Sequence, residues 1–133
     1  MDKEMESGLD LRIGELMDLQ RALAEAHPEW GGHHPEQGLR QMLWMVGELG
    51  EVIDVVKKAS LERYMTATEV REHFVEEFCD VVMYLVDAML CYGVTAEEFS
   101  AAYKKKSAYN LIRDYDAANS RKYGESKENT GEN

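Results

Sequence analysis

The sequence predicts an all-α fold, a bundle of four to five helices, and three observations support that prediction. Apolar residues recur at helical spacing along most of the chain. Both prolines precede residue 36, so none interrupts the helices predicted after that point. No stretch of useful length shows the alternation of apolar and polar residues that is typical of a half-buried strand. The length of 133 residues suits one domain with a single core.

Two helices are predicted in the first half of the chain. The first, residues 8–26, is amphipathic and ends near His27, because the proline that follows disfavours a helical conformation at that residue. The second helix, residues 37–60, is apolar on more than one side, through Leu39, Met42, Leu43, Val46, Leu49, Val52, Ile53 and Val56. A monomer of four helices does not easily cover such a helix, so we expect a homo-oligomer.

Two further helices are predicted in the second half. A short linker, "LERYMTAT", leads to a helix over about residues 68–92, with Thr66 or Thr68 as its N-cap and Gly93 after its end. Thr95, with Glu98 three residues later, forms a capping-box pattern that begins a fourth helix, which runs to about residue 118. The last fifteen residues are polar. We therefore expect a helical domain over residues 1–118 and a disordered tail over residues 119–133.

The charge of the chain limits its partners. A formal net charge of −11 argues against direct contact with nucleic acid, because phosphate backbones are bound by basic surfaces. The same charge does not argue against nucleotides, since a divalent cation can bridge protein carboxylates to phosphates.

The cysteines and the apolar segments predict a compartment. Cys79 and Cys91 lie on one predicted helix, roughly 18 Å apart by helical rise, so they cannot pair within one chain. The N-terminus has no apolar signal region, and the longest apolar stretch, residues 81–94, is too short to span a bilayer. These features predict a protein of the reducing cytoplasm that has no membrane partner.

The third predicted helix carries an unusual acidic strip. Glu76, Glu77 and Asp80 fall within one sector of that helix, and no Lys or Arg occurs between residues 72 and 103. A strip of acidic residues is often just the solvated face of an amphipathic helix. Such a face usually interleaves basic residues at i+3 or i+4, because like charges at that spacing repel. Because this strip contains no basic residue, we infer that the partners of its carboxylates are not side chains.

The second helix contributes carboxylates of its own. Glu48 and Glu51 project from one face within apolar surroundings, and Asp54 extends the row by one turn. A buried, unpaired carboxylate is costly, so something must compensate several of them together. Mg²⁺ is the natural candidate, because it prefers oxygen ligands and retains water. A di-iron site is excluded, because no histidine has a glutamate three residues before it.

The two acidic pairs carry a resemblance to a known family. Glu48-x-x-Glu51 followed by Glu77-x-x-Asp80 resembles the signature of the MazG-type all-α nucleoside triphosphate pyrophosphohydrolases, over roughly residues 10–115. The segment "HHPEQGL", which contains His34, is similar to the His-Pro loop of the dCTP-pyrophosphatase branch. The chain departs from the family at Gly47, where many members have a second glutamate, and it lacks that branch's second aromatic after the first motif.

This resemblance implies a reaction and its cofactor. A Mg²⁺-dependent enzyme of this kind cleaves a nucleoside triphosphate to the monophosphate and pyrophosphate, and its role is often to clean the nucleotide pool. Glu48, Glu51, Glu77 and Asp80 would ligate Mg²⁺, for which Mn²⁺ could substitute, and a bound water would attack the α-phosphorus. We expect Glu51 to be the general base and Glu48 to share in catalysis. The family's bundles are homodimers or homotetramers.

The resemblance also implies substrate-binding residues. "KSAYNLIRDY" resembles the family's K-x-x-x-N-x-x-R element, so Lys106 and Arg113 would pair with phosphate oxygens and Asn110 with the sugar or base. Trp44 and Tyr84 would stack on the base or sugar, and His34 would line the pocket. Asp54 and Glu76 would be outer ligands of the metal or would contact its ligands.

Other functions stay open on the sequence. A phosphoribosyl-ATP pyrophosphohydrolase or a dimeric dUTPase would share the acidic motifs and differ in substrate. A non-catalytic helical protein with a vestigial site is the alternative from another class. A response of the melting temperature to Mg²⁺ separates a metal site from a solvated acidic face.

Overall fold

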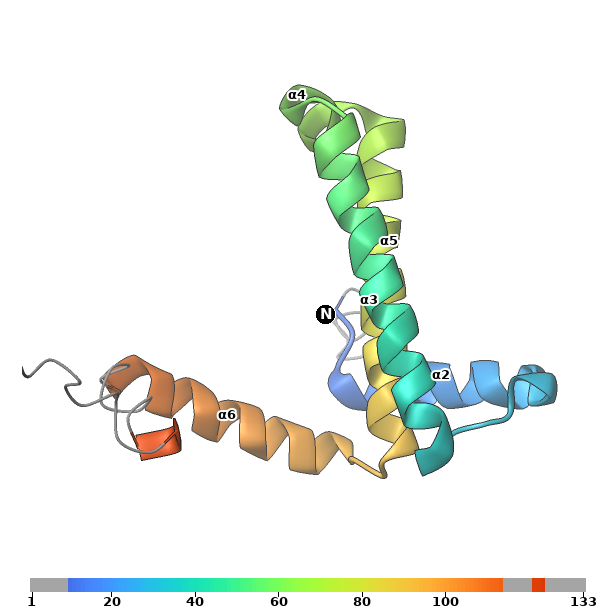
Figure 1. The fold of residues 1–133 in the computed structure, drawn as a ribbon, viewed down its shortest axis with the longest axis vertical. Helices are drawn as coiled ribbons and strands as arrows, with labels where there is room; N and C mark the ends of the chain where they lie inside the picture. Colours follow the sequence, from blue (N-terminus) through green and yellow to red (C-terminus); the bar gives the residue numbers. More distant parts are fainter. Residues whose placement is uncertain (1–9, 114–120, 124–133) are drawn as a thin grey trace, which may run out of the picture. The chain divides into compact units, whose positions relative to one another are not determined.

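The computed structural model describes residues 10–113 and 121–123, and every regular element in these ranges is a helix. The all-α prediction is thus confirmed for the described part of the chain. The elements are α2 (Ile13–Ala26), η1 (Pro28–Trp30), α3 (Pro35–Lys58), α4 (Leu61–Thr66), α5 (Thr68–Cys91) and α6 (Ala96–Ile112) (Figure 1). The chain divides into two compact units, residues 1–98 and 99–133.

The first unit is built on a helical hairpin. Helices α3 and α5 lie side by side in opposite directions, and the short α4 joins them at one end (Figure 1). Helix α2 packs against α5 and contributes Met17, which is almost completely buried. The hairpin contributes Val52, Val55, Val86, Ala88 and Cys91 to the core. Burying a side chain the size of valine or methionine contributes ~1.5–3 kcal/mol, so this small set holds the three helices together.

A close contact lies at the open end of the hairpin. Gly38, near the start of α3, is buried against the ring of Tyr92, which follows α5. A β-carbon at residue 38 would collide with the outer atoms of that ring. Because Tyr92 is 51% exposed, a larger residue at position 38 would displace the ring toward solvent.

Several predicted helix ends are confirmed. Helix α2 ends at Ala26, directly before His27 and Pro28, and Gly93 follows α5 in the left-handed conformation with a φ of 69°. The Thr95 hydroxyl accepts a hydrogen bond of 3.1 Å from the Glu98 amide, as the capping-box pattern predicts. These ends depend on interactions within a few residues of each other.

The predicted linker between the two long helices is wrong, because Leu61–Thr66 forms α4. Ser60 caps α4 by accepting a hydrogen bond from the Arg63 amide at 3.4 Å. The predicted N-cap of α5 is also wrong, because Ala67 takes that position without a side-chain hydrogen bond. The Thr66 hydroxyl donates instead to the Glu62 carbonyl oxygen inside α4, at 2.6 Å.

The predictions for the C-terminal part are tested only in places. Helix α6 ends at Ile112 among the described residues, whereas the prediction extended it to about residue 118. The predicted boundary at residue 118 lies outside the described residues, as does most of the predicted tail. Residues 121–123 alone are described there, and they are helical and exposed. At the other end of the chain, residues 10–12 precede α2 and are not helical, although the prediction began that helix at residue 8.

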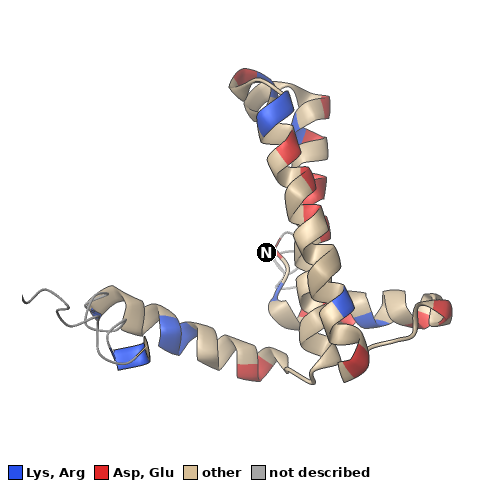
Figure 2. Cartoon of the chain, viewed as in Figure 1, with Lys and Arg blue, Asp and Glu red and all other residues tan. Residues whose placement is uncertain are grey.

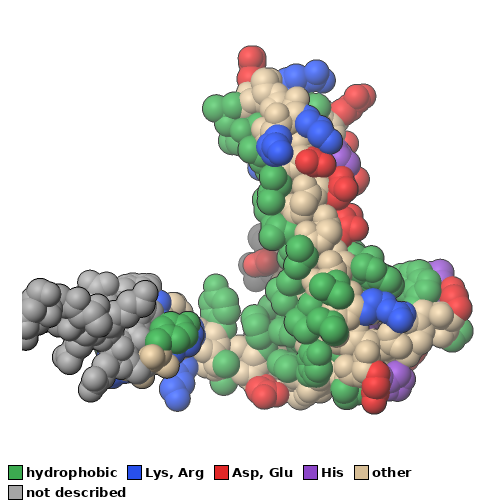
Figure 3. All heavy atoms as spheres, in the orientation of Figure 1, with side chains coloured by type: hydrophobic (Ala, Val, Ile, Leu, Met, Phe, Trp, Pro, Cys, Tyr) green, Lys and Arg blue, Asp and Glu red, His purple; other side chains and the backbone are tan. Residues whose placement is uncertain are grey.

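Helix α3 presents a long apolar face outside the core. Figure 3 shows hydrophobic side chains gathered over the lower part of this helix. Between 36% and 61% of each of the following residues is exposed: Leu39, Met42, Leu43, Val46, Leu49, Ile53 and Val56. We call these seven residues the α3 apolar face. In the described ranges, no single helix is long and apolar enough to cross a membrane, and only α5 and α6 taken together as a bent pair meet that criterion.

Candidate metal centre and the cavity beside it

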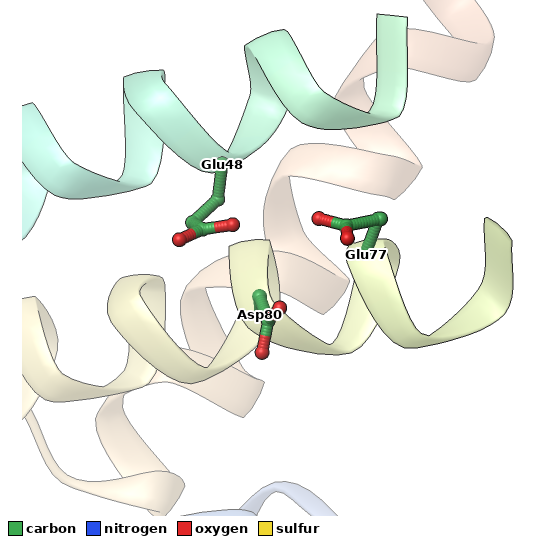
Figure 4. A group of neighbouring side chains, drawn as sticks. All are labelled: Glu48, Glu77 and Asp80. Carbon is green, nitrogen blue, oxygen red and sulfur yellow. The ribbon is translucent and has the colours of Figure 1, made fainter. Parts of the chain in front are cut away.

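Three carboxylates from the two long helices converge in the hairpin. Glu48 projects from α3, and Glu77 and Asp80 project from successive turns of α5 toward it (Figure 4). One oxygen from each side chain lies within 4.8 Å of the others. Neighbouring ligands of an octahedral Mg²⁺ are about 3 Å apart at the usual metal–oxygen distance. Small rotations about the side-chain bonds would therefore bring the three carboxylates, which we call the acidic triad, to one ion.

The triad lacks compensating positive charge in the part of the chain that the structure describes. No lysine or arginine there forms an ion pair with any of the three carboxylates, and Figure 2 shows acidic segments without basic ones along the middle of α5. The Glu77 Oε2 atom is buried and has no hydrogen-bond partner among these residues, and Oε1 lies 3.5 Å from His73 Nε2. An orphaned carboxylate oxygen in an acidic cluster fits the donor set of a hard divalent cation.

The same surroundings change the titration of Glu48. Burial raises the pKa of its carboxyl above the ordinary value, and the negative charges of Asp80, Glu77 and Glu51 raise it further. Both causes disfavour the ionised form of Glu48 in the absence of a cation. A bound divalent cation would remove this penalty, because its charge favours the ionised carboxylate.

The other predicted acidic residues lie at the edge of the triad or away from it. Glu51 is exposed one turn after Glu48 and is not among the three that converge. Asp54, one turn further, pairs with Lys58 at 3.2 Å. Glu76 is exposed on α5. Three of the four residues predicted as metal ligands therefore lie close together, and the fourth, Glu51, does not.

A cavity of about 610 Å³ adjoins the triad and shares two of its residues. Its size falls within the range of small-molecule sites in proteins. Helices α2, α3 and α5 and the turn η1 contribute its lining, which consists of Gln20, Leu23, Glu29, Trp30, Arg40, Gln41, Trp44, Glu48, Asp80, Met83, Tyr84 and Asp87. The predicted residues Trp44 and Tyr84 are therefore both at this cavity.

Aromatic rings form part of the cavity wall. The rings of Trp44 and Tyr84 meet edge to face, with centroids 5.7 Å apart and planes at 64°. The Arg40 guanidinium lies 5.8 Å from the centre of the Trp44 ring and brings a positive charge to the cavity. Burial raises the pKa of the Tyr84 hydroxyl, and the charges of Glu48, Asp80 and Asp87 raise it further, so Tyr84 remains a hydrogen-bond donor at neutral pH.

A polar group centred on Asp87 lies at the cavity and was not predicted from the sequence. Gln20 Nε2 donates to both carboxylate oxygens of Asp87 at 3.2 Å, and His33 Nε2 lies 2.8 Å from Oδ1. Asp87 was visible in the sequence as a carboxylate in an apolar run, but nothing near it in the chain pointed to Gln20 or His33. Gln41, a buried polar residue on α3, was missed as well.

The two histidines of the loop before α3 border one shallow depression but differ in their other contacts. His33 contacts Asp87, as described above. His34, the histidine predicted to line the pocket, is exposed and borders a shallow depression with Arg21 and Glu25. It is not among the residues that line the cavity beside the triad.

The predicted phosphate-binding residues belong to the second unit. Lys106 and Asn110 lie on α6, and Arg113 follows its end. The Lys106 ammonium and the Arg113 guanidinium lie 5.6 and 5.8 Å from the centre of the Tyr109 ring. The role of these three residues in binding a substrate stays a prediction.

Comparison with known proteins returns no match to a family model, to a curated protein or to a solved structure. The function is therefore inferred from the triad, the cavity and the motifs that supply them.

Proposed function

We propose that the protein is a Mg²⁺-dependent nucleoside triphosphate pyrophosphohydrolase. The observation that carries this proposal is the convergence of Glu48 with Glu77 and Asp80, three carboxylates without a lysine or arginine partner in the described residues, beside a cavity with aromatic walls. A triphosphate needs a divalent cation to approach such an acidic surface, and the cavity is large enough for the nucleoside. The reaction releases pyrophosphate and a nucleoside monophosphate.

The acidic triad would hold the ion, with Mn²⁺ as a substitute for Mg²⁺. When bound, the ion neutralises phosphate charge and lowers the pKa of a coordinated water. We propose Glu51, which is exposed one turn after Glu48 on α3, as the group that would accept the proton of the attacking water. Attack at the α-phosphorus breaks the bond to the bridging oxygen, and pyrophosphate leaves.

Other residues would bind and orient the substrate. Trp44 and Tyr84 would contact the base or sugar, and Arg40 at the same cavity would pair with a phosphate oxygen. Asp54 and Glu76 would act only at a distance, since Asp54 is engaged by Lys58 and Glu76 is exposed. Lys106, Asn110 and Arg113 are proposed to contribute phosphate and sugar contacts on the basis of their motif alone.

The α3 apolar face supports a homo-oligomer as part of this proposal. Only six apolar residues are buried among the described residues, while seven on α3 alone are left substantially exposed. A contiguous apolar surface of this kind is typical of an interface. A second copy of the chain would cover it, as the breadth of the apolar pattern on this helix led us to expect.

The test measures pyrophosphate release from all canonical ribonucleoside and deoxyribonucleoside triphosphates and from phosphoribosyl-ATP, in Mg²⁺ and in EDTA. We expect Mg²⁺-dependent release that Glu77→Gln and Asp80→Asn each reduce at least a hundredfold. Glu72→Gln, an exposed carboxylate on the same helix, is the matched control and should retain activity. Release from phosphoribosyl-ATP alone would show that the protein is a phosphoribosyl-ATP pyrophosphohydrolase. No release from any compound would overturn the hydrolase proposal.

A further inference from the structure

Asp87 is held firmly at the cavity by two side chains from distant parts of the chain. Gln20 on α2 donates to both of its oxygens, and His33, in the loop before α3, contacts Oδ1. His33 Nε2 donates to Oδ1 in the tautomer that carries the proton on Nε2, because a carboxylate oxygen accepts hydrogen bonds. The Asp87 side chain is 17% exposed, which leaves it accessible from the cavity that it lines.

The hydrogen bonds from the described residues do not saturate this carboxylate. A carboxylate accepts up to about four hydrogen bonds. Among those residues, Oδ1 accepts from both Gln20 and His33, whereas Oδ2 accepts from Gln20 alone. Oδ2 therefore retains capacity for a donor from a molecule in the cavity.

Gln41 is a further buried polar residue in the wall of this cavity, with 9% of the residue exposed. Its Oε1 has no hydrogen-bond partner among the described residues, but less than 1 Å² of that atom is accessible, so a molecule in the cavity does not reach it unless the side chain rotates. The acceptors that the cavity offers directly are therefore the carboxylate oxygens of Asp87 on α5.

Aromatic rings beside these acceptors indicate that the ligand is flat. Trp30, Trp44 and Tyr84 line the cavity, and such rings stack on heteroaromatic bases. The cavity also includes Glu48 and Asp80 of the acidic triad, so a base held here would place its phosphates toward the proposed metal centre.

We propose that this cavity selects a nucleobase with an exocyclic amino group, and that Asp87 is the residue that makes the selection. The proposal rests on the proposed function, because it names the substrate class for that site. Cytosine, adenine and guanine present amino donors, and carboxylates accept hydrogen bonds from such groups in other base-reading sites. Uracil and thymine instead present one ring N–H between two carbonyl oxygens, and those oxygens would face acceptors.

The first test measures binding of CMP, UMP, AMP, GMP and thymidine monophosphate by calorimetry, which does not depend on hydrolysis. We expect at least one amino-bearing nucleotide to bind on the order of tenfold or more tightly than UMP and thymidine monophosphate, because the loss of a hydrogen bond to a charged group has an effect of this size. Equal or tighter binding of UMP would overturn the proposal.

The second test is the Asp87→Asn variant. Gln20 and His33 would hold the new amide oxygen where the carboxylate accepts now, so the amide nitrogen would face the cavity as a donor. The preference for the amino-bearing base should fall at least tenfold and move toward UMP. Asp18→Asn, the same change at an exposed residue of α2, is the control and should keep the original ranking. An unchanged ranking in a folded Asp87→Asn variant would overturn the role of Asp87.

The outcomes separate this inference from the proposed function. Pyrophosphate release with uracil nucleotides as the best substrates would leave the hydrolase proposal intact and overturn the proposed preference for amino-bearing bases. Selective binding of an amino-bearing monophosphate without hydrolysis of its triphosphate would do the reverse. If Asp87→Asn does not fold, Asp87→Ser takes its place, and it should also weaken the preference because it removes the carboxylate. Absence of binding by every nucleotide would overturn both.

Discussion

The His33 imidazole and the Asp87 carboxylate lie 2.8 Å apart, although 54 residues separate them in the chain. Both side chains are largely buried, with exposed fractions of 16% and 17%. The contact ties the loop before α3 to the last turns of α5 and so orients the wall of the cavity.

Replacing His33 with alanine should destabilise the protein by about 1–3 kcal/mol, because it removes a donor from a largely buried carboxylate. Urea denaturation of His33→Ala, Asp87→Ala and the double variant measures the coupling between them. We expect a coupling of about 0.5–3 kcal/mol. Additive losses would show that the two groups do not stabilise each other.

Mg²⁺ should raise the melting temperature of the wild-type protein by several degrees at concentrations well above its dissociation constant, because a ligand that binds only the folded state stabilises it. Differential scanning fluorimetry with MgCl₂, against NaCl at matched ionic strength, checks this. The rise should disappear in Asp80→Asn and persist in Glu72→Gln. A similar rise in all three proteins would indicate screening of the acidic surface instead of a site.

The raised pKa of Glu48 predicts how stability depends on pH when no divalent cation is present. The folded protein holds this proton more tightly than the unfolded chain does, so the fold is penalised as pH rises from the unfolded pKa of 4.5 through the raised value. Glu48→Gln removes the group that ionises. In EDTA, the variant should melt at a higher temperature than the wild type at pH 7, and the difference should shrink toward pH 4. A difference that is independent of pH would contradict this assignment.

The contact between Gly38 and Tyr92 predicts the effect of a small substitution. Gly38→Ala should destabilise the protein by about 1 kcal/mol, because the added methyl group displaces the half-exposed Tyr92 ring from its packing against α3. Gly47→Ala on the same helix is the control, since open space surrounds a β-carbon there. This control should be neutral or stabilising, by up to about 1 kcal/mol, because alanine favours the helix. Urea denaturation of both variants provides the comparison.

The α3 apolar face predicts self-association. Size-exclusion chromatography with light scattering should give the mass of at least two chains for the wild type. Val46→Lys and Ile53→Lys should shift the protein to a smaller species, because each puts a charge into the proposed interface. Leu61→Lys, an exposed apolar residue on α4, should leave the mass unchanged. A wild-type protein with the mass of one chain would contradict the interface.

Features that depend on neighbouring residues could be predicted from the amino-acid sequence. The stop before Pro28, the left-handed Gly93 and the cap at Thr95 all follow from local backbone chemistry. The i, i+3 spacing of Glu77 and Asp80 likewise places both on one face of a helix, whatever packs against it. Thr66 has two local alternatives, a cap for α5 or a hydrogen bond within α4. In the structure its hydroxyl donates to Glu62 within α4.

Which side chains from distant parts of the chain meet depends on how the helices pack. Glu48 and Glu51 share one face of α3, and the packing of that helix against α5 brings Glu48 rather than Glu51 into the triad. The contacts of Asp87 with Gln20 and His33 span 67 and 54 residues. Contacts of this kind depend on how helices rotate and cross when their apolar faces pack, and no local pattern in the chain specifies those angles.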